Sequence, residues 1–131
     1  MKGFKGNIEK ETRENDNFRK VLYTGKHLQL VLMSLKPGEE IGSEIHQEND
    51  QFFRFETGAG KCTIDENDYP VTEGDVIVVP AGAKHNVINT GTAPFKMYTI
   101  YGPPNHQDGI VRATKKEADK KDEHFDGVTS E

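Results

Sequence analysis

Two histidines and one carboxylate in this chain have the residue types and the spacing to hold a divalent metal ion. Glu44 and His46 are two residues apart, so on a β-strand both side chains would lie on the same face. His85 comes from a separate, later segment. Two imidazoles with one carboxylate are a recognised ligand set for a transition metal that keeps open coordination positions. Such a metal could polarise an oxygen of a bound organic molecule, provided the fold brings the three residues together.

His85 is placed by a tight turn between two predicted strands. Residues 76–79 form an apolar strand candidate, and the Pro-Ala-Gly sequence at 80–82 forms the turn. Proline fixes φ there, and glycine tolerates the conformations that other residues avoid. A strand that opens at His85 puts its imidazole on the same face as Val87 and Asn89. The imidazole can therefore point into the interior of a barrel.

Short strand candidates recur along the chain, and residues typical of turns separate them. The candidates are residues 20–24, 28–35, 41–46, 51–56, 61–65, 69–71, 76–79, 85–89 and 95–101. Many short strands at such spacing predict an antiparallel sandwich or barrel. The barrel core is therefore expected over about residues 20–101 of a single domain, 1–131. Residues 102–131 are expected to form a loop and a short C-terminal helix or tail, with Thr114 as a candidate helix cap.

Alternation along residues 51–56 predicts which side chains face the interior. One face carries Gln51, Phe53 and Phe55, and the other carries Phe52, Arg54 and Glu56. We expect the first set to point inward, with its two aromatic rings walling a cavity beside the amide. The second set is expected to point outward, where an exposed aromatic ring at Phe52 would suggest a contact with a partner subunit.

The segment around His85 resembles the second sequence motif of the cupin superfamily. The motif has the form Gly-x5-Pro-x-Gly-x2-His-x3-Asn, and the matching residues are Gly74, Pro80, Gly82, His85 and Asn89. The resemblance extends over about residues 20–101. It implies an all-β fold, the double-stranded β-helix or jelly-roll barrel. It also implies a homodimer, since small cupins commonly pair through the edges of their barrels.

The first cupin motif is altered in this chain. His46 matches the motif, but Glu44 stands where the family has its first histidine, and Gln51 stands where the family has a carboxylate. The resemblance implies a metal site built from Glu44, His46, Gln51 and His85, which keeps one negative charge but moves it to another ligand. Iron, manganese, zinc and nickel all suit such a set. The alternative is a barrel that has lost its metal, in which these side chains bond to one another.

A subgroup of small cupins, called mannose-6-phosphate-isomerase-like, shares further residues with this chain. These are the Glu-Ile-His and Asp-Gln-Phe-Phe-Arg sequences and an ending with Pro103, Pro104 and His106. The resemblance implies Lewis-acid isomerase chemistry on a sugar or an organic acid, with Glu44 catalytic. A non-catalytic sugar-binding or sensor module and an iron-dependent dioxygenase are the alternatives. We expect Phe53, Phe55, Tyr101 and His106 to contact the substrate, although alternation leaves the face of Tyr101 open and His106 could equally lie on a surface loop.

The composition excludes several classes of protein. The net charge is −5, and the basic residues are scattered among acids, which argues against nucleic acid as a partner. The charged N-terminus lacks the apolar segment of a signal peptide, and no apolar run is long enough to span a bilayer. The single cysteine, Cys62, cannot form an intramolecular disulfide. We therefore expect a soluble cytoplasmic protein. The cupin resemblance implies a small molecule as its partner.

Overall fold

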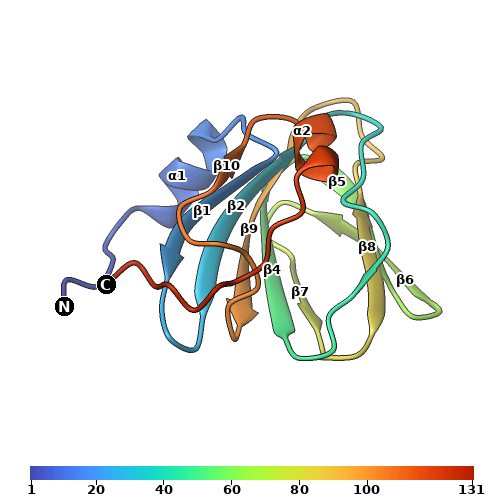
Figure 1. The fold of residues 1–131 in the computed structure, drawn as a ribbon. Coiled ribbons are helices and arrows are strands. Elements are labelled where there is room, and N and C mark those ends of the chain that lie inside the picture. Colours follow the sequence, from blue (N-terminus) through green and yellow to red (C-terminus); the bar gives the residue numbers. More distant parts are fainter.

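Two antiparallel β-sheets face each other in the computed structural model, which describes residues 1–131 (Figure 1). The elements in chain order are α1 (Ile8–Glu14), β1 (Arg19–Thr24), β2 (Gln29–Leu35), β3 (Glu44–Ile45), β4 (Asp50–Thr57), β5 (Ala59–Ile64), β6 (Asn67–Thr72), β7 (Val76–Val79), β8 (Lys84–Ile88), β9 (Phe95–Gly102), β10 (Val111–Arg112) and α2 (Lys115–Lys120). One sheet has the order β10-β1-β2-β9-β4-β7, and the other has the order β3-β8-β5-β6. The predicted all-β jelly-roll fold is thereby confirmed.

Strand β9 shows how the sequence pattern produces the inner face of the larger sheet. Phe95, Met97, Thr99 and Tyr101 are buried, and the residues between them are only partly covered. The strand lies between β2 and β4, and its alternation continues the alternation of both neighbours. Tyr101 therefore faces the space between the sheets, which alternation alone had left open.

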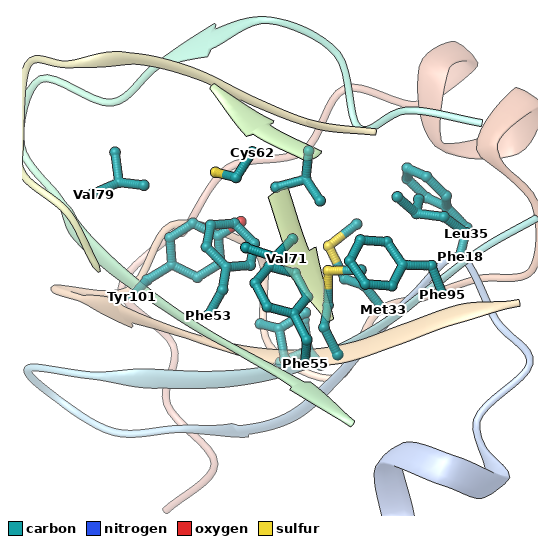
Figure 2. Close-up of a cluster of buried hydrophobic side chains, with 14 of the residues drawn as sticks. Phe18, Met33, Leu35, Phe53, Phe55, Cys62, Val71, Val79, Phe95 and Tyr101 are labelled. Carbon is teal, nitrogen blue, oxygen red and sulfur yellow. The ribbon is translucent and has the colours of Figure 1, made fainter. Parts of the chain in front are cut away.

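Aromatic side chains fill the centre of this space (Figure 2). The ring of Phe55 stacks on the ring of Phe95 with 4.9 Å between centroids, and Phe53 lies parallel to Phe55 at 6.1 Å. Burying one such side chain stabilises the fold by about 1.5–3 kcal/mol. Cys62 belongs to the same cluster, and burial raises the pKa of its thiol to about 11. Its thiolate is therefore scarce at neutral pH, which agrees with a structural role.

One expectation for β4 is wrong. Glu56 was expected to point outward, but it is buried, and its carboxylate lies 3.2 Å from the Nε atom of Arg54. The register between β4 and β9 shifts between Phe55 and Thr57, so a bulge interrupts the alternation at this point. Phe52 lies on the outer face as expected, but it is half-buried beside Tyr98, at 6.3 Å between ring centroids.

The ends of the chain add elements that the strand pattern did not predict. Helix α1 begins after Asn7, whose side chain accepts a hydrogen bond from the amide of Lys10, and its Thr12 is fully buried. Strand β10 extends the larger sheet beyond residue 101 by pairing with β1. Thr114 caps α2 as expected, but that helix ends at Lys120, and residues 121–131 continue as an irregular C-terminal tail. Neither helix is long and apolar enough to cross a membrane.

Candidate metal centre

Three of the four predicted ligands lie together at one end of the smaller sheet. Glu44 in β3 is the direct cross-strand partner of His85 in β8, and His46 follows β3 immediately. One ligand atom from each of these residues lies within 4.8 Å of the others. The Nε2 atom of His46 is 2.9 Å from the Oε2 atom of Glu44, and the rings of His46 and His85 are 5.2 Å apart. The fold therefore brings together the two imidazoles and the carboxylate.

His85 is oriented by the turn that precedes it. Its Nδ1 atom is 3.2 Å from the carbonyl oxygen of Ala83, so this nitrogen carries the proton and the Nε2 atom keeps its lone pair. The side chain is buried, and burial lowers its pKa, which favours the neutral imidazole. The Nε2 atom has no hydrogen-bond partner in the protein. Metal-bound histidines commonly show this arrangement, in which a backbone carbonyl holds the opposite nitrogen.

Gln51 lies on the larger sheet, on the inner face of β4. Its Nε2 atom donates a hydrogen bond to the Oγ1 atom of Thr99 at 3.0 Å, while its buried Oε1 atom has no partner. Gln51 is the direct cross-strand partner of Tyr101, whose ring meets His46 edge-on at 5.7 Å. The amide thus has a free acceptor near the histidines, and its membership of the ligand set stays a prediction.

The residues present fit a divalent transition metal. Buried polar atoms are normally paired, yet His85 Nε2 and Gln51 Oε1 are both unpaired. A metal ion would use both lone pairs, together with His46 and Glu44. Without a metal, the hydrogen bond between Glu44 and His46 satisfies those two residues but leaves His85 unsatisfied.

A cavity of about 380 Å³ opens beside Glu44 and His46, and we call it the site cavity. It is lined by Phe18, Arg19, Ile41, Glu44, Ile45, His46, Asn105, His106, Ala118, Asp119, Lys121, Asp122, Glu123 and His124. The end of α2 and the first residues of the C-terminal tail therefore form one wall. Figure 1 shows this red segment running from α2 across the sheets toward the N-terminus.

Tyr101 and His106 form a buried pair beside the cavity. The Nε2 atom of His106 is 3.2 Å from the hydroxyl oxygen of Tyr101, and both side chains are buried. His106 therefore lies inside the protein and not on the surface loop that was the alternative. Burial, reinforced by the charge of Arg19, lowers the pKa of His106 to about 2, and burial raises the pKa of Tyr101. Both side chains are neutral at physiological pH.

The two phenylalanines predicted to contact the substrate lie deeper in the barrel. Phe53 and Phe55 point inward as expected, but both are fully buried in the aromatic cluster of Figure 2 and neither lines the site cavity. Their contact with a substrate stays a prediction. Conversely, Arg19 and Glu123 line the cavity and were not singled out. Each stands among many other charged residues in the sequence, and no local spacing connects one to the other.

Comparison with known proteins agrees with the fold. A family model described as "Cupin domain" matches residues 31–101. The chain belongs to the cupin family. The protein BH2720 from Bacillus halodurans, known from a crystal structure, is 44% identical, with a TM-score of 0.90 over 92% of this chain and 96% of that chain.

Two curated relatives are also informative. The protein YrkC of Bacillus subtilis (strain 168) is 49% identical over 123 residues, which cover 89% of this cupin and 66% of YrkC. The mannose-1-phosphate guanylyltransferase RfbM of Salmonella typhimurium is 26% identical over 73% of this cupin but only 20% of RfbM. This cupin therefore spans just under two thirds of YrkC and a fifth of RfbM.

Proposed function

We propose that this cupin binds one divalent transition metal and acts on a small polar organic molecule in the site cavity. His46, His85 and Glu44 would hold the ion, and the amide oxygen of Gln51 would be a fourth, neutral ligand. The observation that carries the proposal is the buried, unpaired Nε2 atom of His85, which lies within ligand distance of the other two side chains. A metal ion would satisfy this atom and use the neighbouring carboxylate at the same time.

Isomerisation is the reaction that we propose for this site. When bound, the metal supplies a positive charge that polarises a carbonyl or hydroxyl oxygen. The side chain of Glu44 is one-third exposed, so its carboxylate can reach a ligand in the cavity. Glu44 would accept a proton from the carbon beside the polarised carbonyl and return it to the neighbouring carbon, while the hydroxyl proton moves to the carbonyl oxygen. The likeness to part of RfbM, whose name refers to mannose 1-phosphate, supports a sugar or a sugar-derived acid as substrate.

Metal analysis of protein purified without an affinity tag tests this proposal. We expect close to one transition-metal ion per chain in the wild-type protein and a loss of that ion in His46→Ala. The matched control is His27→Ala, which removes an exposed imidazole between β1 and β2 that is not among the proposed ligands. If the wild-type protein contains no metal and cannot be loaded with one, the proposal is wrong. If the ion is iron, dioxygenase chemistry becomes the better alternative to isomerisation.

A non-catalytic binding or sensor cupin is the second candidate. The hydrogen bond of 2.9 Å between Glu44 and His46 favours it, because it satisfies two of the three ligands without an ion. This alternative predicts that a sugar or an organic acid binds with no product formed. If the wild-type protein turns over a substrate, and Glu44→Ala still folds but has no turnover, the protein is an enzyme.

We also propose that the protein works as a homodimer in the cytoplasm. Strand β7 is an edge strand of the larger sheet, and its Val76 and Val78 are exposed. Val78 is the cross-strand partner of Phe52, so the apolar surface continues onto β4. A second copy of the chain is the occupant that this surface fits.

A further inference from the structure

A carboxylate of the C-terminal tail is buried between two arginines. The side chain of Glu123 is 8% exposed, although it belongs to an irregular segment after α2. Its Oε1 atom is 3.6 Å from the Nη1 atom of Arg19 in β1, and its Oε2 atom is 3.2 Å from the Nη2 atom of Arg112 in β10. The Nδ1 atom of His106 is 3.8 Å from the same carboxylate. Because His106 is neutral, the two arginines alone supply the positive charge.

The two arginines need an anion because of their place in the sheet. Arg19 and Arg112 are direct cross-strand partners in β1 and β10. Their side chains are 10% and 14% exposed, so water screens neither of them well. Like charges opposite each other in a sheet are destabilising, and a buried charge without a partner costs more still. The pair is therefore an anion-binding site within the fold, whichever anion fills it.

Glu123 fills this site incompletely. It approaches each guanidinium through a single nitrogen, and the Nε atoms of Arg19 and Arg112 are buried without any partner. The Oε1 atom of Glu123 and the Nδ1 atom of His106 also lack a hydrogen bond. Arginine binds a carboxylate best through two parallel hydrogen bonds, and this geometry is absent here. A carboxylate that is not tied to the tail could dock closer and use the free nitrogens.

One member of the arginine pair and two of the metal ligands line the site cavity. These are Arg19, Glu44 and His46, and Glu123 lines the same cavity. Arg112 does not line it and is connected to it through Glu123, which it contacts. His106 also lines the cavity and connects the two ends, because it contacts Tyr101, whose ring in turn meets His46. One small molecule could therefore place an anionic group at the arginines and another oxygen at the metal ligands.

We propose that Arg19 and Arg112 form a carboxylate subsite, which Glu123 occupies in the free protein and from which the carboxylate of a small organic acid displaces it. The subsite selects organic acids among the polar molecules that the cavity could take. Placement of the far end of that acid at Glu44 and His46 rests on the proposed metal function; the carboxylate subsite itself does not. The C-terminal tail then acts as a lid, which opens when the ligand displaces Glu123 from the two arginines.

Titration calorimetry with succinate on the full chain tests the subsite, with the protein as purified and again after EDTA treatment. Glu123→Gln keeps the size of the side chain and removes its charge, so it removes the internal competitor. We expect this variant to bind succinate at least tenfold more tightly than the wild-type protein, with and without EDTA. Adding Arg112→Gln to this variant should abolish the gain. The matched control is Glu117→Gln, an acid of α2 that pairs with Lys121 and touches neither arginine.

The variant leaves two buried arginines without an anion, so its folding is measured as well. Succinate should raise the melting temperature of Glu123→Gln and leave that of the double variant unchanged. Glu123→Gln that folds but binds succinate no better than the wild-type protein would overturn the proposal, since Glu123 would then be a fixed anchor. Tighter binding of inorganic phosphate than of succinate would overturn the carboxylate assignment.

The two proposals fail separately. The gain in succinate binding is expected to survive EDTA, so a protein that holds no metal can still confirm the arginine subsite. A protein that loses its metal in His46→Ala but shows no gain in Glu123→Gln would confirm the metal centre and refute the subsite.

Discussion

At the scale of single residues, His106 is a neutral, buried histidine that lies near two buried arginines. His106 is buried, and its pKa is lowered to about 2 by burial first and by the charge of Arg19 second. The carboxylate of Glu123 lies 3.8 Å from His106 but does not keep the imidazole protonated, because Arg19 and Arg112 already pair with that carboxylate. Protonation of His106 therefore costs folding energy.

The sign of the pH dependence follows from this depressed pKa. The unfolded chain binds a proton on His106 near pH 6.5, while the folded protein does not, so stability falls as the pH drops below that value. The greatest slope from one such group is about 1.4 kcal/mol per pH unit. We expect the free energy of unfolding, measured with urea, to fall between about pH 6.5 and 5 with a steeper slope in the wild-type protein than in His106→Gln.

The exposed His124 provides the control for this experiment, because His124→Gln removes a tail histidine that is open to solvent. The free energy of unfolding of His124→Gln should fall with pH at the same slope as that of the wild-type protein. Equal slopes in the wild-type protein and His106→Gln would mean that His106 binds its proton as readily in the folded protein as in the unfolded chain, and the neutral arrangement with Tyr101 would be wrong.

Part of the site could be predicted at this scale and part could not. Glu44 and His46 are two residues apart, and His85 follows a turn that a proline and a glycine define, so local spacing together with the likeness to the cupin motifs was enough to propose them. Glu123 was missed because its partner Arg19 is distant in sequence and joined to it only by the folded sheet. When the residues of a site come from segments that are far apart in the chain, the sequence contains no local spacing from which the site could be predicted.

At the scale of elements, strand β5 shows how closely the smaller sheet approaches the aromatic cluster. Gly60 is buried, and a Cβ atom there would clash with the carbonyl oxygen of Ile88 and with the ring of Phe95. Both neighbours are held in place, one by sheet pairing and the other by stacking on Phe55. Neither can move aside cheaply.

Gly60→Ala should therefore destabilise the protein. Overpacking of this kind costs about 1–3 kcal/mol, and we expect a loss in that range in urea unfolding at constant m-value. Gly25→Ala is the matched control, since its added Cβ atom would lie 3.4 Å from the nearest atom, the carbonyl oxygen of Leu28. A Gly60→Ala protein as stable as the control would show that the two sheets are farther apart than the structure has them.

The elements also show where a strand pattern stops being informative. The strands with apolar alternation were predicted because burial on one face imposes that pattern. Helix α1 and strand β10 were missed, since α1 is mostly charged and β10 has two residues. The short C-terminal helix expected after Thr114 is present and ends at Lys120. Beyond it, the backbone bond from Phe125 to Asn105 and the burial of Glu123 hold the chain in an extended path that helix propensity does not anticipate.

At the scale of the whole molecule, the two ends of the chain close onto the same side of the larger sheet (Figure 1). The carboxylate of Glu131 accepts hydrogen bonds from the amides of Lys2 and Gly3 and from the hydroxyl of Tyr23. The tail thus has an outer anchor at Glu131 and an inner one at Glu123, with the site cavity next to the inner one. Displacement of Glu123 by a ligand would leave the outer anchor in place, so the tail can open without leaving the barrel.

The opposite edge of the same sheet carries the surface for a second copy of the chain. Val76 and Val78 are 49% and 61% exposed on the edge strand β7. An apolar edge strand left open invites pairing with other chains, and proteins usually cover it. Neither terminal segment covers it here: Figure 1 shows both ends of the chain at the other side of the sheet.

Val78→Lys should therefore convert a dimer into a monomer. The charged side chain would be solvated on a free edge but desolvated against a partner, so it opposes association without disturbing the monomer. Sedimentation velocity at micromolar concentration should give a dimer for the wild-type protein and a monomer for the variant. Val128→Lys changes a similarly exposed valine in the C-terminal tail, 59% exposed, and should stay dimeric. A wild-type protein that sediments as a monomer, or a Val78→Lys protein that remains dimeric, would show that β7 is not the contact.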